Sequence, residues 1–233
     1  MESSSCDFAV LISASAEWQE ILPLFPAVKR DHSPYGEFFF TYSGSHPITF
    51  LHGGWGKVAT AGATQYAIDH WQPKFLLNLG TCGGLEGRVD LNTIILAEET
   101  VIYDIIEGMG SYQKAIEHYT SKADLSWLKG ELPLQVKRTK LYSADRDIRP
   151  EDASGILSSL GADSGDWESG AFAWVCARNQ KDWLVLRGVT DLISNKEGEA
   201  LGNVDLWHQR TGPIMKQLVD CLPWILDQYT KSH

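Results

Sequence analysis

The chain has 233 residues and a mass of 25.9 kDa, and its 20 lysines and arginines stand against 30 aspartates and glutamates, a formal net charge of −10. This acidic balance argues against a general binder of nucleic acid or anionic membranes, because such proteins present a basic face. Hydrophobic residues make up 43% of the chain, which excludes global disorder. The length suits one domain over 1–233.

The N-terminus and the cysteines bear on the cellular compartment. Met1 to Asp7 is polar without a signal-type apolar stretch, and no window of about 18 apolar residues could span a membrane. The four cysteines, Cys6, Cys82, Cys176 and Cys221, have neither CxxC nor zinc-ligand spacing. We therefore expect reduced thiols in a cytoplasmic protein that uses no metal and no other cofactor.

Short apolar runs alternate with longer amphipathic stretches in the first part of the chain. The patterns predict a strand at 8–12, a helix at 17–25, strands at 38–42 and 48–51 that pair across a turn, a helix at 58–71 and a strand at 75–79. This order is typical of an α/β protein with a mostly parallel sheet.

The second part continues the alternation. The patterns predict strands at 93–96 and 100–103, which could be one bent strand, a strand at 134–142, helices at 150–160 and 168–179, a strand at 183–189 and a helix at 204–229 that bends near Pro213 or Pro223. The additional strands in the middle favour a mixed sheet.

Residues capable of chemistry follow three of these strands. Gly53-Gly-Trp-Gly-Lys57 precedes a helix, Gly80-Thr-Cys-Gly-Gly84 ends a buried strand, and Thr190-Asp191 ends another. Ligands of α/β proteins bind at the carboxyl ends of strands. The glycine segments could instead be tight turns, and Asp191 could cap a helix.

Glu168 lies at the start of a predicted helix. A glutamate there is ordinarily a partner of the helix dipole. If it points toward the strand ends, its carboxylate can accept two hydrogen bonds from a vicinal diol.

Six segments in this order resemble the nucleoside phosphorylase/nucleosidase superfamily, and most closely its methylthioadenosine/S-adenosylhomocysteine nucleosidases. They are Gly53-Gly-Trp-Gly-Lys-Val-Ala59, Asn78-Leu-Gly-Thr-Cys-Gly-Gly-Leu85, Tyr103-Asp104, Ser143-Ala-Asp145, Trp167-Glu168 with Ala171-Phe-Ala173, and Arg187-Gly-Val-Thr-Asp191. The resemblance implies a three-layer α/β sandwich whose central mixed, partly rolled sheet is flanked by helices.

The resemblance also implies roles for individual residues. Asp191 would protonate N7 of a purine as a general acid, and Glu168 would hold the 2′- and 3′-hydroxyls of the ribose. Thr81, beside Gly80, would position the nucleophile. The backbone around Ile148 would contact the base edge, and Trp167 would lie beneath the ribose.

The identity of the nucleophile depends on basic residues near the strand ends. Phosphorylases of this superfamily usually have an arginine at the position of Asn78 and a basic residue in the first strand–helix loop, which here runs from 13 to 17 without one. A phosphate dianion needs such a cation or several N–H donors, so the sequence favours hydrolysis. Nucleosidases place a water-activating glutamate in this loop; Glu17 is the candidate after a one-residue shift, and Glu20 is the fallback.

Two positions depart from the family pattern. Asp147 stands where nucleosidases stack an aromatic ring on the base, and Trp167 replaces a methionine. Either Trp167 or Trp55 could supply the stacking surface instead. The reaction class is therefore better supported than a preference for adenine.

Three functions remain open at this stage. The first is a purine nucleosidase acting on compounds similar to methylthioadenosine and S-adenosylhomocysteine. The others are a phosphate-dependent phosphorylase and a non-catalytic nucleoside-binding protein. In each case the partner is a small-molecule purine nucleoside, with no nucleic acid and no membrane, and the resemblance implies a homodimer.

Overall fold

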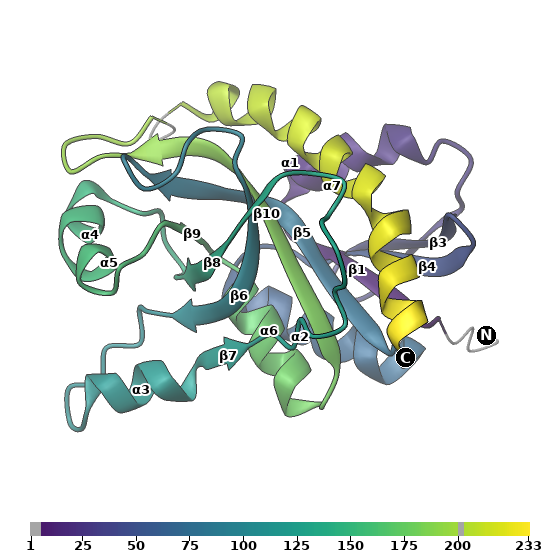
Figure 1. Ribbon diagram of the computed structural model, residues 1–233, viewed down its shortest axis with the longest axis horizontal. Coiled ribbons are helices and arrows are strands. Elements are labelled where there is room, and N and C mark those ends of the chain that lie inside the picture. Colours follow the sequence, from purple (N-terminus) through teal and green to yellow (C-terminus); the bar gives the residue numbers. More distant parts are fainter. Residues whose placement is uncertain (1–5, 200–202) are drawn as a thin grey trace.

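The computed structural model describes residues 6–199 and 203–233, so most of the Met1–Asp7 segment considered above lies outside the described part (Figure 1). The described residues form ten strands: β1 (Phe8–Ile12), β2 (Arg30–His32), β3 (Glu37–Ser43), β4 (His46–His52), β5 (Phe75–Leu85), β6 (Ile94–Ile102), β7 (Thr120–Lys122), β8 (Val136–Ser143), β9 (Ser164–Asp166) and β10 (Asp182–Ile193). The helices are α1 (Ser15–Ile21), a 3₁₀ turn (Leu22–Leu24), α2 (Gly56–Trp71), α3 (Tyr112–His118), α4 (Pro150–Ser154), α5 (Ile156–Ser159), α6 (Ser169–Arg178) and α7 (Val204–Ser232).

The strands form one mixed sheet that is partly closed on itself. Their order is β10-β6-β8-β9-β5-β1-β4-β3-β2, and β7 pairs with β6. Because β10 also pairs with β5, the strands β5, β9, β8, β6 and β10 form a ring, and the remaining strands extend from β5 as an open wing. The pairs β1–β4, β1–β5 and β5–β10 are parallel, whereas β10–β6 and β3–β4 are antiparallel. The expected mixed, partly rolled sheet is confirmed.

Helices cover both faces of this sheet, as Figure 1 shows. Successive side chains of a strand point to opposite faces. In β1, accordingly, Phe8, Val10 and Ile12 join the apolar core beneath α1 and α7, whereas Ala9 and Leu11 join the core beneath α2 and α6. The three layers are therefore helices, sheet and helices.

Three of the expected helices have different ends or a break. The first helix stops at Ile21 and continues as a 3₁₀ turn that contains Pro23. The helix expected over 150–160 is interrupted at Gly155, whose backbone angles (φ −100°, ψ −105°) are not helical. Glu168 is the N-cap of α6 rather than its first residue.

The expected hairpin and bent strand are present. Phe38–Leu51 and Tyr42–Pro47 are partners in the antiparallel pair β3–β4. The stretches at 93–96 and 100–103 belong to the single strand β6, which has a register shift between Ala97 and Glu99 against β8. The prolines at 213 and 223 both lie inside α7, and the axis of this helix changes direction along its length (Figure 1).

No helix within residues 6–199 and 203–233 combines the length and the apolar character needed to cross a bilayer.

Candidate active site

Glu17 lies in the first turn of α1 and folds back over the end of β5. Its Oε2 accepts a hydrogen bond from the N–H of Ala14 (3.2 Å), which caps the helix. Its Oε1 accepts from both the N–H (2.6 Å) and the hydroxyl (2.8 Å) of Thr81. A Cβ at Gly80 would lie 2.8 Å from Oε1, so the glycine permits this approach. Glu20 is exposed instead, so Glu17 is the carboxylate that faces β5.

The surroundings of Glu17 suit a proton acceptor. Burial raises the pKa of this carboxyl, and the charge of Arg187 and the hydrogen bonds from Thr81 oppose that effect. Oε1 already receives two donors, whereas Oε2 receives one at the longer distance of 3.2 Å. A carboxylate oxygen accepts at two lone-pair sites, so Oε2 is the atom with a free site.

Asp191 lies near the end of β10, at an irregularity in the strand. The pairing with β5 shifts between Val189 and Asp191, and Thr190 is the additional residue. Such bulges re-aim side chains and are frequent beside active sites. The Thr190 hydroxyl donates to Asp191 Oδ1 (2.9 Å), and burial raises the pKa of the carboxyl. Asp191 is therefore a strand residue, and the alternative of a helix cap is wrong.

Asp191 shares its surroundings with the predicted base-edge residue. A Cβ at Gly83 would lie 3.5 Å from Asp191 Oδ2 and 3.7 Å from the Cδ1 of Ile148, so both side chains converge on this glycine. Ile148 is buried, in the loop that follows β8. The structure thus brings the predicted acid and the predicted base-edge contact together.

Glu168 is held at the start of α6 and reaches across to α2. Its Oε1 accepts from the N–H of Gly56 (2.9 Å), at the N-terminus of α2. Burial, and secondarily the nearby carboxylate of Asp166, raise the pKa of Glu168. This hydrogen bond links the glycine loop at 53–57 to the start of α6.

Two further motif pairs anchor that glycine loop. The Nζ of Lys57 pairs with Asp104, and the N–H of Lys57 donates to Asp145 Oδ1 (2.7 Å). Asp104 Oδ2 in turn accepts from the N–H of Asp145 (3.0 Å). These contacts join the segments around 104 and 145 to the glycine loop, and they pair the ammonium group of Lys57 with a carboxylate.

The residues that depart from the family pattern lie at the rim of the candidate site. Asp147 and Trp167 line a pocket of about 540 Å³ together with charged side chains of the loop at 145–151. Asp147 is exposed, and Trp167 is partly buried. Trp55 caps α2 directly before Gly56 and is 66% exposed.

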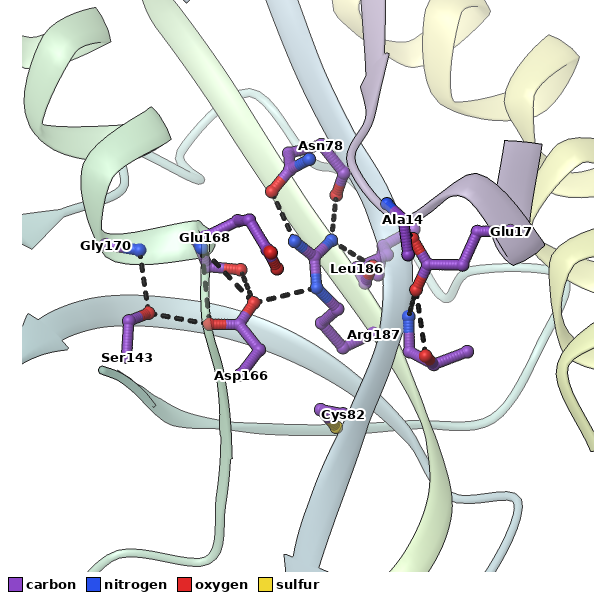
Figure 2. A network of polar contacts seen from close by, with 12 residues as sticks. Ala14, Glu17, Asn78, Cys82, Ser143, Asp166, Glu168, Gly170, Leu186 and Arg187 are labelled. Carbon is purple, nitrogen blue, oxygen red and sulfur yellow. Dashed lines mark hydrogen bonds and ion pairs between the residues drawn. The ribbon is translucent and has the colours of Figure 1, made fainter. Parts of the chain in front are cut away.

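A buried ion pair at the centre of the site was missed by sequence reasoning. Arg187 in β10 donates from Nε to Asp166 Oδ2 (2.8 Å), and its other donors reach the carbonyl (3.0 Å) and the side-chain oxygen of Asn78 (Figure 2). Figure 2 shows the guanidinium between Asp166 and Glu168 on one side and Glu17 on the other. An arginine inside a strongly apolar strand was the available signal, because a buried charge needs a partner.

Asp166 accepts from several further donors. They are the Ser143 hydroxyl (2.6 Å), the N–H of Ser169 (3.2 Å) and the hydroxyl of Ser169. Although Asn78 replaces the arginine of phosphorylases, the structure places the guanidinium of Arg187 beside it. That cation is, however, already neutralised by Asp166.

Within the described ranges, no group of three or more histidine, cysteine, aspartate or glutamate side chains is arranged to hold a metal ion. The four cysteines are all buried and free.

The fold and this set of carboxylates define a class of protein, and a family model identifies it. The model described as the phosphorylase superfamily matches residues 8–220, and the chain belongs to this superfamily. The resemblance read from the six motifs is confirmed.

Two relatives within the superfamily share the name of one enzyme. The chain is 25% identical over 162 residues, covering 65% of the chain and 70% of the relative, to the 5′-methylthioadenosine/S-adenosylhomocysteine nucleosidase of Buchnera aphidicola. It is 25% identical over 167 residues, covering 67% of the chain and 71% of the relative, to the nucleosidase of the same name from Thermotoga maritima.

Solved structures resemble the fold over nearly its whole length. The 5′-methylthioadenosine nucleosidase of Arabidopsis thaliana superposes with a TM-score of 0.80 at 19% identity, covering 95% of this chain and 96% of that one. A Helicobacter pylori nucleosidase mutant with 5′-methylthioadenosine in its active site gives 0.75 at 18% identity, covering 94% and 98%.

Proposed function

We propose that the chain is an N-ribosyl hydrolase that cleaves the glycosidic bond of purine nucleosides similar to methylthioadenosine and S-adenosylhomocysteine. The observation that carries this proposal is Glu17, a buried carboxylate whose Oε1 is saturated by Thr81 and whose Oε2 keeps a free acceptor site. The names of the curated relatives support the same reaction and substrate class.

Asp191 is the general acid in this proposal. Burial raises the pKa of its carboxyl, which keeps the proton available at higher pH. Transfer of that proton to N7 of the base makes the purine a better leaving group as the C1′–N9 bond breaks.

Glu17 is the general base. A water molecule attacks C1′ as its proton passes to Oε2 of Glu17, and the products are the free sugar and the free purine. One proton leaves Asp191 and one arrives at Glu17, so the step balances, and proton exchange with solvent restores both carboxyls before the next turnover.

Glu168 holds the ribose hydroxyls, because its carboxylate reaches the strand ends beside Gly56. Trp167 lies beneath the ribose, and the backbone at Ile148 contacts the base edge. Asp147 and Trp55 stand at the rim, where they contact the base or the 5′-substituent.

The charge of the site favours water over phosphate. Arg187 is the cation among these carboxylates, and Asp166 is paired with it at 2.8 Å. In the hydrolase Glu17 acts as a carboxylate, so a phosphate dianion beside it would meet like charge in a poorly solvated site.

Incubations with three nucleosides test the proposal. Purified protein is mixed with methylthioadenosine, adenosine or inosine, each with and without phosphate, and released base and sugar are measured. Base release without phosphate supports the hydrolase. Ribose 1-phosphate, formed only with phosphate, would instead identify a phosphorylase. Binding detected as a raised melting temperature, without base release, would identify a non-catalytic protein.

A homodimer of single-domain subunits belongs to the same proposal. It is supported by large apolar side chains that are exposed around the glycine loop, at Trp55, Val58, Ile106 and Met109. The Lys57–Asp104 ion pair joins the two segments that carry them. Light scattering of wild type and Val58→Glu tests this, since the charge should yield monomers. A cytoplasmic location is supported by the four free thiols.

A further inference from the structure

Trp207, in the first turn of α7, reaches the proposed base through Thr81. Its indole Nε1 lies 3.1 Å from Thr81 Oγ1, and the same Oγ1 lies 2.8 Å from Glu17 Oε1. Trp207 is partly buried, and 126 residues separate it from Thr81 in the sequence. Three elements that are distant in sequence, α7, β5 and α1, thus meet in one chain of hydrogen bonds.

The chemistry of these groups fixes the direction of the chain. An indole N–H can only donate, whereas a hydroxyl has one proton and can both donate and accept. Thr81 Oγ1 must therefore accept from Trp207, and its own proton is directed to Glu17 Oε1. The N–H of Thr81 also donates to Oε1 (2.6 Å), so Glu17 is the acceptor in both hydrogen bonds at this oxygen.

We propose that Trp207 is a positioning residue of the hydrolytic site, whose indole N–H orients the Thr81 hydroxyl so that Glu17 stays an ionised acceptor with Oε2 free for the proton of water. This inference rests on the proposed function, because it concerns how Glu17 serves as the base. Trp207 acts through Thr81 and needs no contact with the substrate.

Loss of the indole N–H frees the Thr81 hydroxyl to turn. The hydroxyl then accepts a hydrogen bond from a protonated Glu17 Oε1 as readily as it donates one to the ionised carboxylate. The charged groups that face Glu17 are Arg187 from β10 and Glu168 from the start of α6, and both are unchanged by this loss. Glu17 is then protonated more easily, so the rate begins to fall at a higher pH on the acid side of its pH profile.

The test compares Trp207→Phe with a matched control. Trp174→Phe removes an indole N–H that donates to the carbonyl of His118, also at 3.1 Å, on the outer side of α6. For Trp207→Phe we expect a fall in kcat/KM of about three- to tenfold, the effect of one hydrogen bond, with the loss mainly in kcat. We also expect its acid limb to rise by about half a pH unit. Trp174→Phe should match wild type in both respects.

A double variant isolates the route of the effect. In a Thr81→Val background there is no hydroxyl to orient, so Trp207→Phe should cause no further loss; in a Thr81→Ser background the loss should reappear. Trp207→Leu, which also lacks the N–H, replaces Trp207→Phe if the latter does not fold.

The outcomes separate this inference from the proposed function. An unshifted acid limb, or an equal loss with and without the Thr81 hydroxyl, would overturn the positioning role while leaving the hydrolase intact. A rise in KM alone would also overturn it, because it indicates direct substrate contact. Failure of wild type to release base without phosphate would instead remove the proposed function.

Discussion

The Asp166–Arg187 pair offers a strict test of how this site is held together. Both side chains are only 2% exposed, and the pair is joined at 2.8 Å. In Asp166→Ala the guanidinium keeps its contacts with Asn78 but loses its counter-charge. The hydroxyls of Ser143 and Ser169 lose their acceptor as well.

The size of the effect follows from this burial. Removing one partner of a buried ion pair costs about 3–5 kcal/mol, because the remaining charge is left uncompensated. For a chain of this length each kcal/mol lowers the melting temperature by about 2–4 °C, so Asp166→Ala should melt about 6–20 °C below wild type. Arg187→Met in the same chain removes the orphaned charge, so the double variant should recover part of the loss.

Urea and thermal unfolding of the four proteins in this cycle measure the coupling. Asp220→Ala is the control, because it breaks the Lys216–Asp220 pair, whose side chains are 61% and 59% exposed. Exposed pairs contribute about 0–1 kcal/mol, so this variant should melt close to wild type. An Asp166→Ala loss no larger than that of the control, or losses that simply add in the double variant, would refute the reasoning.

Three other substitutions probe the carboxylates and the glycine loop. Asp191→Asn should lower kcat/KM by about 10²–10⁴-fold in a base-release assay, since it removes the proposed acid, and a rate within about twofold of wild type would eliminate that role. Burial raises the pKa of Glu168, so its contribution to stability is present at low pH and is lost as the pH rises. Glu168→Gln should therefore raise the melting temperature more at about pH 8 than at about pH 5, and equal shifts would contradict this sign. Gly80→Ala places a Cβ 2.8 Å from Glu17 Oε1 and should lower kcat by about 10²-fold, because it displaces the proposed base; an unchanged kcat would show that the carboxylate can move aside without consequence.

Local patterns predicted that Asp191 ends a buried strand, whereas the roles expected of Asp191, Glu168 and Glu17 came from the family resemblance. Asp191 follows an apolar run long enough to be a buried strand, and a residue at such a position reaches the ligand edge of an α/β sheet. Which of Glu17 and Glu20 faces β5 could be seen only in the structure, because it depends on the capping contact of Glu17 with Ala14 and on the side of α1 that faces β5.

Long-range partners were beyond the sequence. Arg187 and Asp166 are 21 residues apart, and Asp166 belongs to a strand of three residues, too short to have a readable period. The break at Gly155 was hidden as well, because a single glycine inside an apolar periodic stretch is compatible with a continuous helix. Closure of the ring by β10 is a property of the whole sheet and leaves no local signature.

Because β10 is a central strand, we expect the site to stay intact for as long as the sheet is folded. This strand pairs with β5 from Asp182 to Ile193 and with β6 at Leu186–Gly188, so its middle is hydrogen-bonded on both edges. Central strands open to solvent only when the entire domain unfolds, and their amides are the last to exchange with deuterium. Since Arg187 and Asp191 both lie on β10, heating should leave the reactive geometry intact up to the cooperative transition. Loss of activity and loss of structure should then coincide in a single step.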